Sequence, residues 1–189
     1  MLSNPTHNPT RRDVLRTGGL MLAGVATGSG LQAQDVVFDI GMRSDIDGAH
    51  VWFDPIGLLV PVGSTLRWTI HENVHTATAY HPDNDNHSLR IPQGAAPWDS
   101  DYLVNPGDSF EVTLTVPGVY DYYCAPHEYG GMVGRIIVGE AAGRGTLAYD
   151  YFKAEENTSG WEEVPELAQA AFPSIGSIIT NGIVRVEDG

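Results

Sequence analysis

The middle of the chain, from residue 35 to residue 140, contains short segments typical of β-strands, and in several of them hydrophobic and polar residues alternate. A period of two residues is typical of β-strands that bury one face. Turn residues such as proline, glycine, asparagine and aspartate separate the segments. The segments lie at residues 36–40, 49–53, 58–62, 65–70, 109–116, 119–123 and 133–138. About seven short strands at this spacing predict an all-β protein with a β-sandwich.

Two stretches in these segments, 58–60 and 136–138, are hydrophobic at every position. Such uninterrupted stretches are also typical of strands that are buried on both faces of a parallel sheet. A sheet of that kind needs long connections between its strands, and these are usually helices. Because no helical pattern lies between the segments, the sequence favours the sandwich.

Residues 141–189 differ in character from the strands before them. Gly143 to Gly145 is typical of a linker. Short elements are predicted beyond it, with a helix over 165–171 that has proline at its first turn, a helix over 174–180 and a strand over 183–186. We therefore expect one domain over 34–140, followed by a short mixed C-terminal extension over 141–189. The sequence assigns no chemistry to this extension.

The first 33 residues have the three-part layout of a secretory signal. Arg11 and Arg12 precede a hydrophobic run of 14 residues over 18–31, and Ala33 marks a cleavage position. The run is shorter than the roughly 20 residues that a membrane span needs, and the arginine pair resembles a twin-arginine export signal. We therefore expect an exported protein with a signal segment over 1–33. The alternatives are an uncut segment that anchors the protein to the membrane, and a tail with a chance arginine pair.

The chain carries 24 acidic and 10 basic residues, which gives a formal net charge of −14. Three of the basic residues, Arg11, Arg12 and Arg16, lie in the N-terminal segment. Because no basic stripe is present that would bind phosphates, nucleic acid is excluded as a partner. An acidic surface suits solubility in a salty medium, as in a halophile, and also steering toward a basic partner.

The candidate chemistry centres on Cys124, which is the only cysteine and therefore has no disulfide partner within the chain. His127 and Met132 follow it at spacings of three and five residues. A thiolate, an imidazole and a weak thioether favour copper, which cycles between Cu(I) and Cu(II), whereas zinc rarely takes a thioether. Three extended residues span about 10 Å, so the chain must turn before Cys124 and His127 can bind one ion. Pro126 and the Gly130-Gly131 pair favour that turn.

A second imidazole is required as the fourth ligand. The candidates are the histidines in and before the long loop that follows the strand at 65–70, namely His71, His75, His81 and His87. His75 is preferred because it lies just past the end of that strand, where it can face the loop that carries Cys124. His71, near the same strand end, is the main alternative. His81 and His87 are expected to be exposed loop residues, and the sequence leaves open whether His71, His81 or His87 binds a second metal.

In its candidate ligands and the segments around them, the sequence resembles the plastocyanin, pseudoazurin and halocyanin family of small blue copper proteins, and the halocyanins most closely. The resemblance covers residues 51–139, about half of the chain. It rests on segments that occur in the family's order: Phe53-Asp-Pro55, Val62-Gly63, Val74-His75, Pro106-Gly107, and Tyr122 through Gly134. The resemblance implies a cupredoxin-like Greek-key β-sandwich. It also implies a single type 1 copper ion held by His75, Cys124 and His127, with Met132 as the axial ligand.

A function is implied by the same resemblance. Proteins of this family carry one electron between redox partners and perform no bond chemistry, so the chain is expected not to be an enzyme. His127 would be the electron exit, surrounded by Ala125, Pro126, Tyr129 and Gly130. The implied partners are redox proteins of a membrane electron-transport chain, at the extracytoplasmic face of the cell membrane or in the periplasm.

Two features depart from the family's pattern. Many members have asparagine directly after the first histidine ligand, where it ties the two ligand loops together, and this chain has Thr76. The threonine hydroxyl is expected to make a weaker tie. The loop over 81–101 is also longer and richer in histidine, asparagine and aspartate than a minimal member needs, and its role is open.

Two other functions remain as alternatives. A copper chaperone or reservoir would bind the same metal, but a site built for release is more often rich in methionine or histidine than locked by a thiolate. An accessory domain of a copper oxidase or nitrite reductase would need a second copper centre, and the chain has only loosely spaced extra histidines. A binuclear copper domain of the respiratory type is excluded because Cys124 has no second cysteine beside it.

Overall fold

The computed structural model describes residues 36–155, 158 and 160–186. The predicted signal segment over 1–33, with Arg11 and Arg12, lies outside the described residues. Within the described part of the chain, no helix is both long enough and hydrophobic enough to cross a bilayer. The contacts among the described residues group them into one compact unit.

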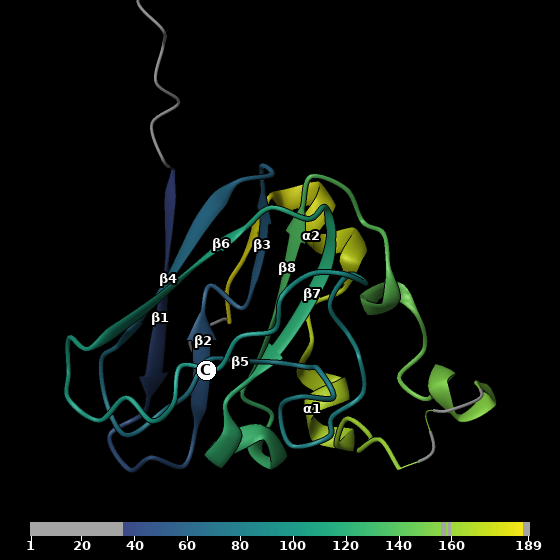
Figure 1. The fold of residues 1–189 in the computed structure, drawn as a ribbon. Coiled ribbons are helices and arrows are strands. Elements are labelled where there is room, and N and C mark those ends of the chain that lie inside the picture. The colour runs from purple at the N-terminus through teal and green to yellow at the C-terminus, as the bar shows by residue number, and fades with distance from the viewer. Residues whose placement is uncertain (1–35, 156–157, 159, 187–189) are drawn as a thin grey trace, which may run out of the picture. The chain divides into compact units, whose positions relative to one another are not determined.

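The described residues form two β-sheets (Figure 1). The first sheet has the order β2-β1-β4-β6 and contains β2 (Val51–Asp54), β1 (Val37–Ser44), β4 (Ser64–Ile70) and β6 (Ser109–Leu114). The second has the order β5-β7-β8-β3-β9 and contains β5 (Thr78–Ala79), β7 (Gly118–Tyr123), β8 (Val133–Val138), β3 (Gly57–Val60) and β9 (Ile183–Val184). The predicted all-β sandwich is confirmed, and each predicted segment contains a strand. Only β5 was not predicted, because two residues are too few to show an alternating pattern.

The two fully hydrophobic stretches lie side by side in the second sheet. β3 and β8 pair in parallel, with Leu58 opposite Ile136 and Val60 opposite Val138. Their connection needs no helix, because the chain between them passes through the first sheet as β4 and β6. The sequence argument against a parallel pairing of these two segments is therefore wrong in this detail, although the sandwich is right.

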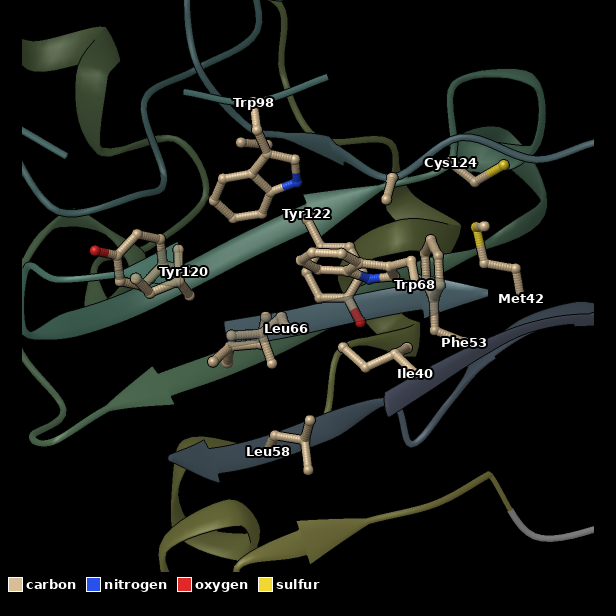
Figure 2. Packing of buried hydrophobic residues seen from close by; sticks show 14 of the residues in the cluster. Ile40, Met42, Phe53, Leu58, Leu66, Trp68, Trp98, Tyr120, Tyr122 and Cys124 are labelled. Atoms are coloured by element: carbon tan, nitrogen blue, oxygen red, sulfur yellow. The ribbon is translucent and has the colours of Figure 1, made fainter. Parts of the chain in front are cut away.

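Large aromatic side chains fill the space between the sheets. Trp68 from β4 packs edge to face on Tyr122 from β7, with ring centroids 5.3 Å apart, and Phe53 from β2 lies 4.7 Å from Tyr122. Figure 2 shows these rings, with Cys124 at one end of the same cluster. Burial of each large hydrophobic side chain stabilises the fold by about 1.5–3 kcal/mol. This packing fixes the end of β7 and therefore the position of Cys124.

The C-terminal extension packs on the second sheet. It contains the 3₁₀ helices η2 (Arg144–Thr146) and η3 (Tyr151–Ala154) and the helices α1 (Glu166–Ala171) and α2 (Ile175–Asn181). The two α-helices and β9 confirm the elements predicted for this region. The segment Gly143 to Gly145 is not a free linker, since a Cβ atom at buried Gly145 would lie 2.8 Å from the carbonyl oxygen of Val119.

A buried ion cluster joins the extension to the sandwich. Asp121 in β7 accepts hydrogen bonds from Arg90 Nε at 2.8 Å and Arg135 Nε at 2.7 Å, and all three side chains are almost fully buried. Arg90 also donates to the carbonyl oxygen of Gly145 at 3.1 Å, and Arg135 donates to that of Pro173 at 3.0 Å. The two guanidinium groups therefore connect the strand that precedes Cys124 to both halves of the extension.

Candidate metal centre

A tight turn closes the ligand loop, which we define as residues 124–132 between β7 and β8. Most of the loop forms the 3₁₀ helix η1 (Ala125–Gly130), with proline in its first turn. His127 N donates to Cys124 O at 2.9 Å, and Cys124 N donates to Met132 O at 3.0 Å. Gly131 ends η1 with a φ of 85°, a left-handed conformation that glycine adopts without strain. The turn predicted between Cys124 and His127 is therefore present.

His75 reaches this loop from the segment after β4. Its backbone pairs with Leu103, since His75 N donates to Leu103 O at 3.2 Å and Leu103 N donates to His75 O at 2.9 Å. The side chain of His75 is fully buried. His71 is exposed, and its ring lies beside Gly41 instead. The structure therefore brings His75, and not His71, to Cys124.

Three potential ligand atoms converge at this end of the sandwich. Cys124 Sγ lies 3.6 Å from His75 Nδ1 and 3.4 Å from His127 Nδ1, and the two Nδ1 atoms are 3.2 Å apart. A point equidistant from the three atoms lies about 2.0 Å from each, close to the roughly 2.0–2.3 Å of bonds from imidazole nitrogen or thiolate sulfur to a first-row metal ion. Among the described residues, this is the one group of three histidine, cysteine or acidic side chains placed to hold a metal. The donor set and its spacing fit a single ion.

Met132 is the remaining residue of the predicted ligand set. It is fully buried and belongs to the same hydrophobic cluster as Cys124. Its backbone N–H donates to His127 O at 3.2 Å, so the backbone of the loop links it to both other residues of the motif.

Thr76 ties the two ligand-bearing segments together. Its backbone N–H donates to Cys124 Sγ at 3.3 Å, and its hydroxyl accepts from Ala125 N at 2.8 Å. The same hydroxyl hydrogen-bonds Thr78 Oγ1 at 2.9 Å. The tie expected from Thr76 is therefore present.

The electrostatics of the cluster favour neutral donors in the metal-free protein. Burial, with a smaller effect of His127, lowers the pKa of His75 to about 4, and burial also lowers the pKa of His127. Burial raises the pKa of the Cys124 thiol to about 12, although the hydrogen bond from Thr76 N opposes this rise. Both imidazoles are therefore uncharged at neutral pH and can donate a lone pair. Metal binding must displace the thiol proton.

The residues around His127 differ in exposure. His127 is partly exposed, whereas His75 and Cys124 are fully buried. Pro126 and Tyr129 are exposed beside it, with Tyr129 at 77%. His127 is therefore the one member of the three-residue cluster that reaches solvent.

The two loop histidines take no part in the cluster. His81 is partly buried and not fully exposed as expected, and its Nδ1 lies 3.5 Å from a carboxylate oxygen of Asp83. His87, which was expected to be exposed, is 8% exposed, and its Nε2 lies 3.0 Å from Glu128 Oε2. That expectation is wrong because the ligand loop and the extension cover His87. Sequence reasoning also missed buried Glu128, since glutamate is rarely buried and its partners are distant in sequence.

A β-sandwich with two imidazoles and a cysteine sulfur converging at one end belongs to the class of mononuclear copper proteins with a cupredoxin fold. Comparison with known proteins agrees with this class. The family model for copper binding proteins of the plastocyanin/azurin family matches residues 40–139. Native pseudoazurin from Hyphomicrobium denitrificans superimposes with a TM-score of 0.50 and 22% identity, covering 72% of this chain and 92% of that one, and it supports the fold.

Plastocyanins are similar in sequence as well. The chloroplastic plastocyanin of Hordeum vulgare is 33% identical over 124 residues, which cover 66% of this chain and 71% of that protein. That of Chlamydomonas reinhardtii is 32% identical over 120 residues, which cover 62% of this chain and 79% of that protein. The chain belongs to the plastocyanin/azurin family of copper binding proteins. Its cofactor is copper, it is an electron carrier and not an enzyme, and its partners are redox proteins.

Proposed function

We propose that this protein is an exported one-electron carrier whose single copper ion is bound by His75, Cys124, His127 and, as a weak fourth ligand, Met132. The observation that carries the proposal is the convergence of three donor atoms, each 3.2–3.6 Å from the other two. Two histidines turn the same ring nitrogen toward one buried sulfur, as ligands of a single ion do. The bound copper would supply the change between Cu(I) and Cu(II).

The protein's own residues would keep the site in one arrangement. The backbone pairing of His75 with Leu103, the turn of the ligand loop and the bonds of Thr76 hold the donors in place. Because these bonds hold the donors in one arrangement, little would have to rearrange when the bound ion gains or loses an electron. Buried His75 and Cys124 exclude water from the inner side. The partly exposed His127 is then the route by which the electron enters and leaves.

The net charge of the protein indicates its partners, and the N-terminal segment indicates its location. The net charge of −14 would steer encounters with basic patches of redox proteins, which we place in a membrane electron-transport chain. The same charge suits a salty medium and supports the expected nearness to halocyanins. The twin-arginine layout of residues 1–33 supports export to the extracytoplasmic face of the membrane or the periplasm. An uncut segment there would associate the protein with the membrane.

A copper chaperone or reservoir is the second candidate. It would share the ligands but would need to release the ion readily. The depth of the site argues for the carrier, since His75 and Cys124 are each 0% exposed.

Copper loading followed by visible spectroscopy tests the proposal. We expect an intense blue band at one copper per chain, which bleaches on reduction and returns on oxidation over many cycles. A chaperone would instead pass its copper to a competing chelator within the time of one cycle. A colourless copper complex, or binding of two ions per chain, would overturn the assignment.

A further inference from the structure

Glu128 is an unusual residue of the ligand loop. It directly follows His127, yet its side chain is only 4% exposed. Each carboxylate oxygen has a partner, because the Tyr80 hydroxyl donates to Oε1 at 2.7 Å and His87 Nε2 lies 3.0 Å from Oε2. A buried carboxylate is costly unless it is bonded in this way. The loop is therefore held at a second point, close to His127 but outside the metal cluster.

His87 is itself held firmly. Its Nδ1 lies 2.9 Å from the carbonyl oxygen of Asn84, which can only accept, so Nδ1 carries a hydrogen. The opposite nitrogen, Nε2, then shares one proton with Glu128 Oε2. The imidazole ring stacks on Tyr123, with centroids 4.4 Å apart. Tyr123 immediately precedes Cys124, and Glu128 immediately follows His127. The bonded pair of Glu128 and His87 therefore lies next to both ligands along the chain.

The segment that carries His87 is bonded to the C-terminal extension. Ser88 N donates to Glu162 O at 3.1 Å, and Glu162 N donates to Asn86 O at 2.8 Å, which forms a short parallel bridge beside His87. Helix α1 of the extension also contacts η1 directly. A Cβ atom at Gly131 would lie 3.4 Å from the carbonyl oxygen of Leu167. The extension thus supports the ligand loop in two places.

We propose that Glu128 is a positioning residue for the copper site, and that its buried bond to His87 links the ligand loop to the C-terminal extension. It would fix the orientation of His127 without touching the ion. The proposal rests on the proposed function, because it takes His127 to be a copper ligand. The C-terminal extension then has a role, which is to stabilise the ligand loop that contains His127.

Substitutions of Glu128 with a matched rescue test the proposal. E128A removes both bonds. E128Q keeps them, because its amide oxygen can accept from Tyr80 and its NH₂ group can donate to His87 Nε2. We expect E128A to lower the copper affinity about tenfold, the lower end of the range for lost outer partners of ligands, and to shift the reduction potential and the blue band. E128Q should restore all three, and E162A, which removes an exposed side chain, should leave them unchanged.

Two further variants locate the effect. H87A removes one of the two bonds that E128A removes, so it should shift the same readouts in the same direction. The double variant should change them by less than the sum of the two single variants, because the single variants share the loss of that bond. E162P removes the N–H that binds Asn86 O and should move the same readouts, whereas E162A keeps that N–H. A merely structural role would lower the unfolding temperature and leave the potential and spectrum of the folded protein unchanged.

The outcomes separate this proposal from the proposed function. A wild-type protein without a blue copper band would overturn the proposed function itself. A blue wild type whose band and potential are unchanged in E128A and H87A would overturn the positioning role alone. An effect of E128A and H87A without any effect of E162P would overturn the link to the extension.

Discussion

Thr76 and Cys124 are joined by a hydrogen bond in which the backbone N–H of Thr76 donates to the cysteine sulfur at 3.3 Å. The Thr76 hydroxyl extends the tie by accepting from Ala125 N at 2.8 Å. Since His75 directly precedes Thr76, these bonds hold the two segments that carry the inner ligands at a fixed separation.

Replacing Thr76 with valine should destabilise the copper-free protein. The shape of the side chain is kept, but the N–H of Ala125 loses its partner, which costs about 1–3 kcal/mol for a buried group. Urea unfolding measures the change. T65V is the control, because Thr65 makes its hydroxyl bond to Thr113 at the surface. A loss of stability no larger than that of T65V would contradict the tie.

The copper-free protein should lose stability as the pH falls through the range in which His75 titrates. Burial lowers the pKa of His75 from 6.5 to about 4. Between these values the unfolded chain binds a proton at His75 and the folded protein does not, so acid favours unfolding. The contribution is fully present above pH 6.5 and is lost by about pH 4, and it amounts to at most about 3 kcal/mol.

The urea unfolding free energy, measured from pH 7 to pH 4 for the wild type and for H75N, isolates this contribution. The curve for H75N should fall less steeply than the wild-type curve over that interval. Parallel curves would show that His75 does not titrate in this way.

The buried cluster around Asp121 should be sensitive to the loss of its single negative charge. D121N leaves the guanidinium groups of Arg90 and Arg135 buried without a counter-charge, which typically costs about 3–5 kcal/mol. Denaturant unfolding gives the value. The matched control is E111Q, which breaks an exposed pair with Arg67 and should cost less than about 1 kcal/mol. Equal losses of unfolding free energy in D121N and E111Q would show that the buried cluster contributes no more to stability than an exposed ion pair.

The sequence predicted most strands because each one forms a short alternating or fully hydrophobic segment between turn residues. It predicted the ligand loop because Cys124, His127 and Met132 lie within nine residues. His75 was preferred over His71 from its place after a strand end, and the structure brings it to Cys124. Glu128 and His87 could not be found in this way. They are 41 residues apart, and their burial depends on a docked extension whose contacts leave no local pattern. The parallel pairing of β3 and β8 was also missed. It depends on how the chain between them passes through the other sheet, and the two segments themselves carry no sign of that path.

Substitution of Cys124 with serine, followed by measurement of copper content and visible absorption, tests the central claim most directly. The hydroxyl of serine does not provide the soft sulfur donor that a blue copper site requires. We predict that the wild type binds one copper with an intense blue band and that C124S has no blue band and a much lower copper affinity. A C124S protein that retains the blue colour would contradict the account.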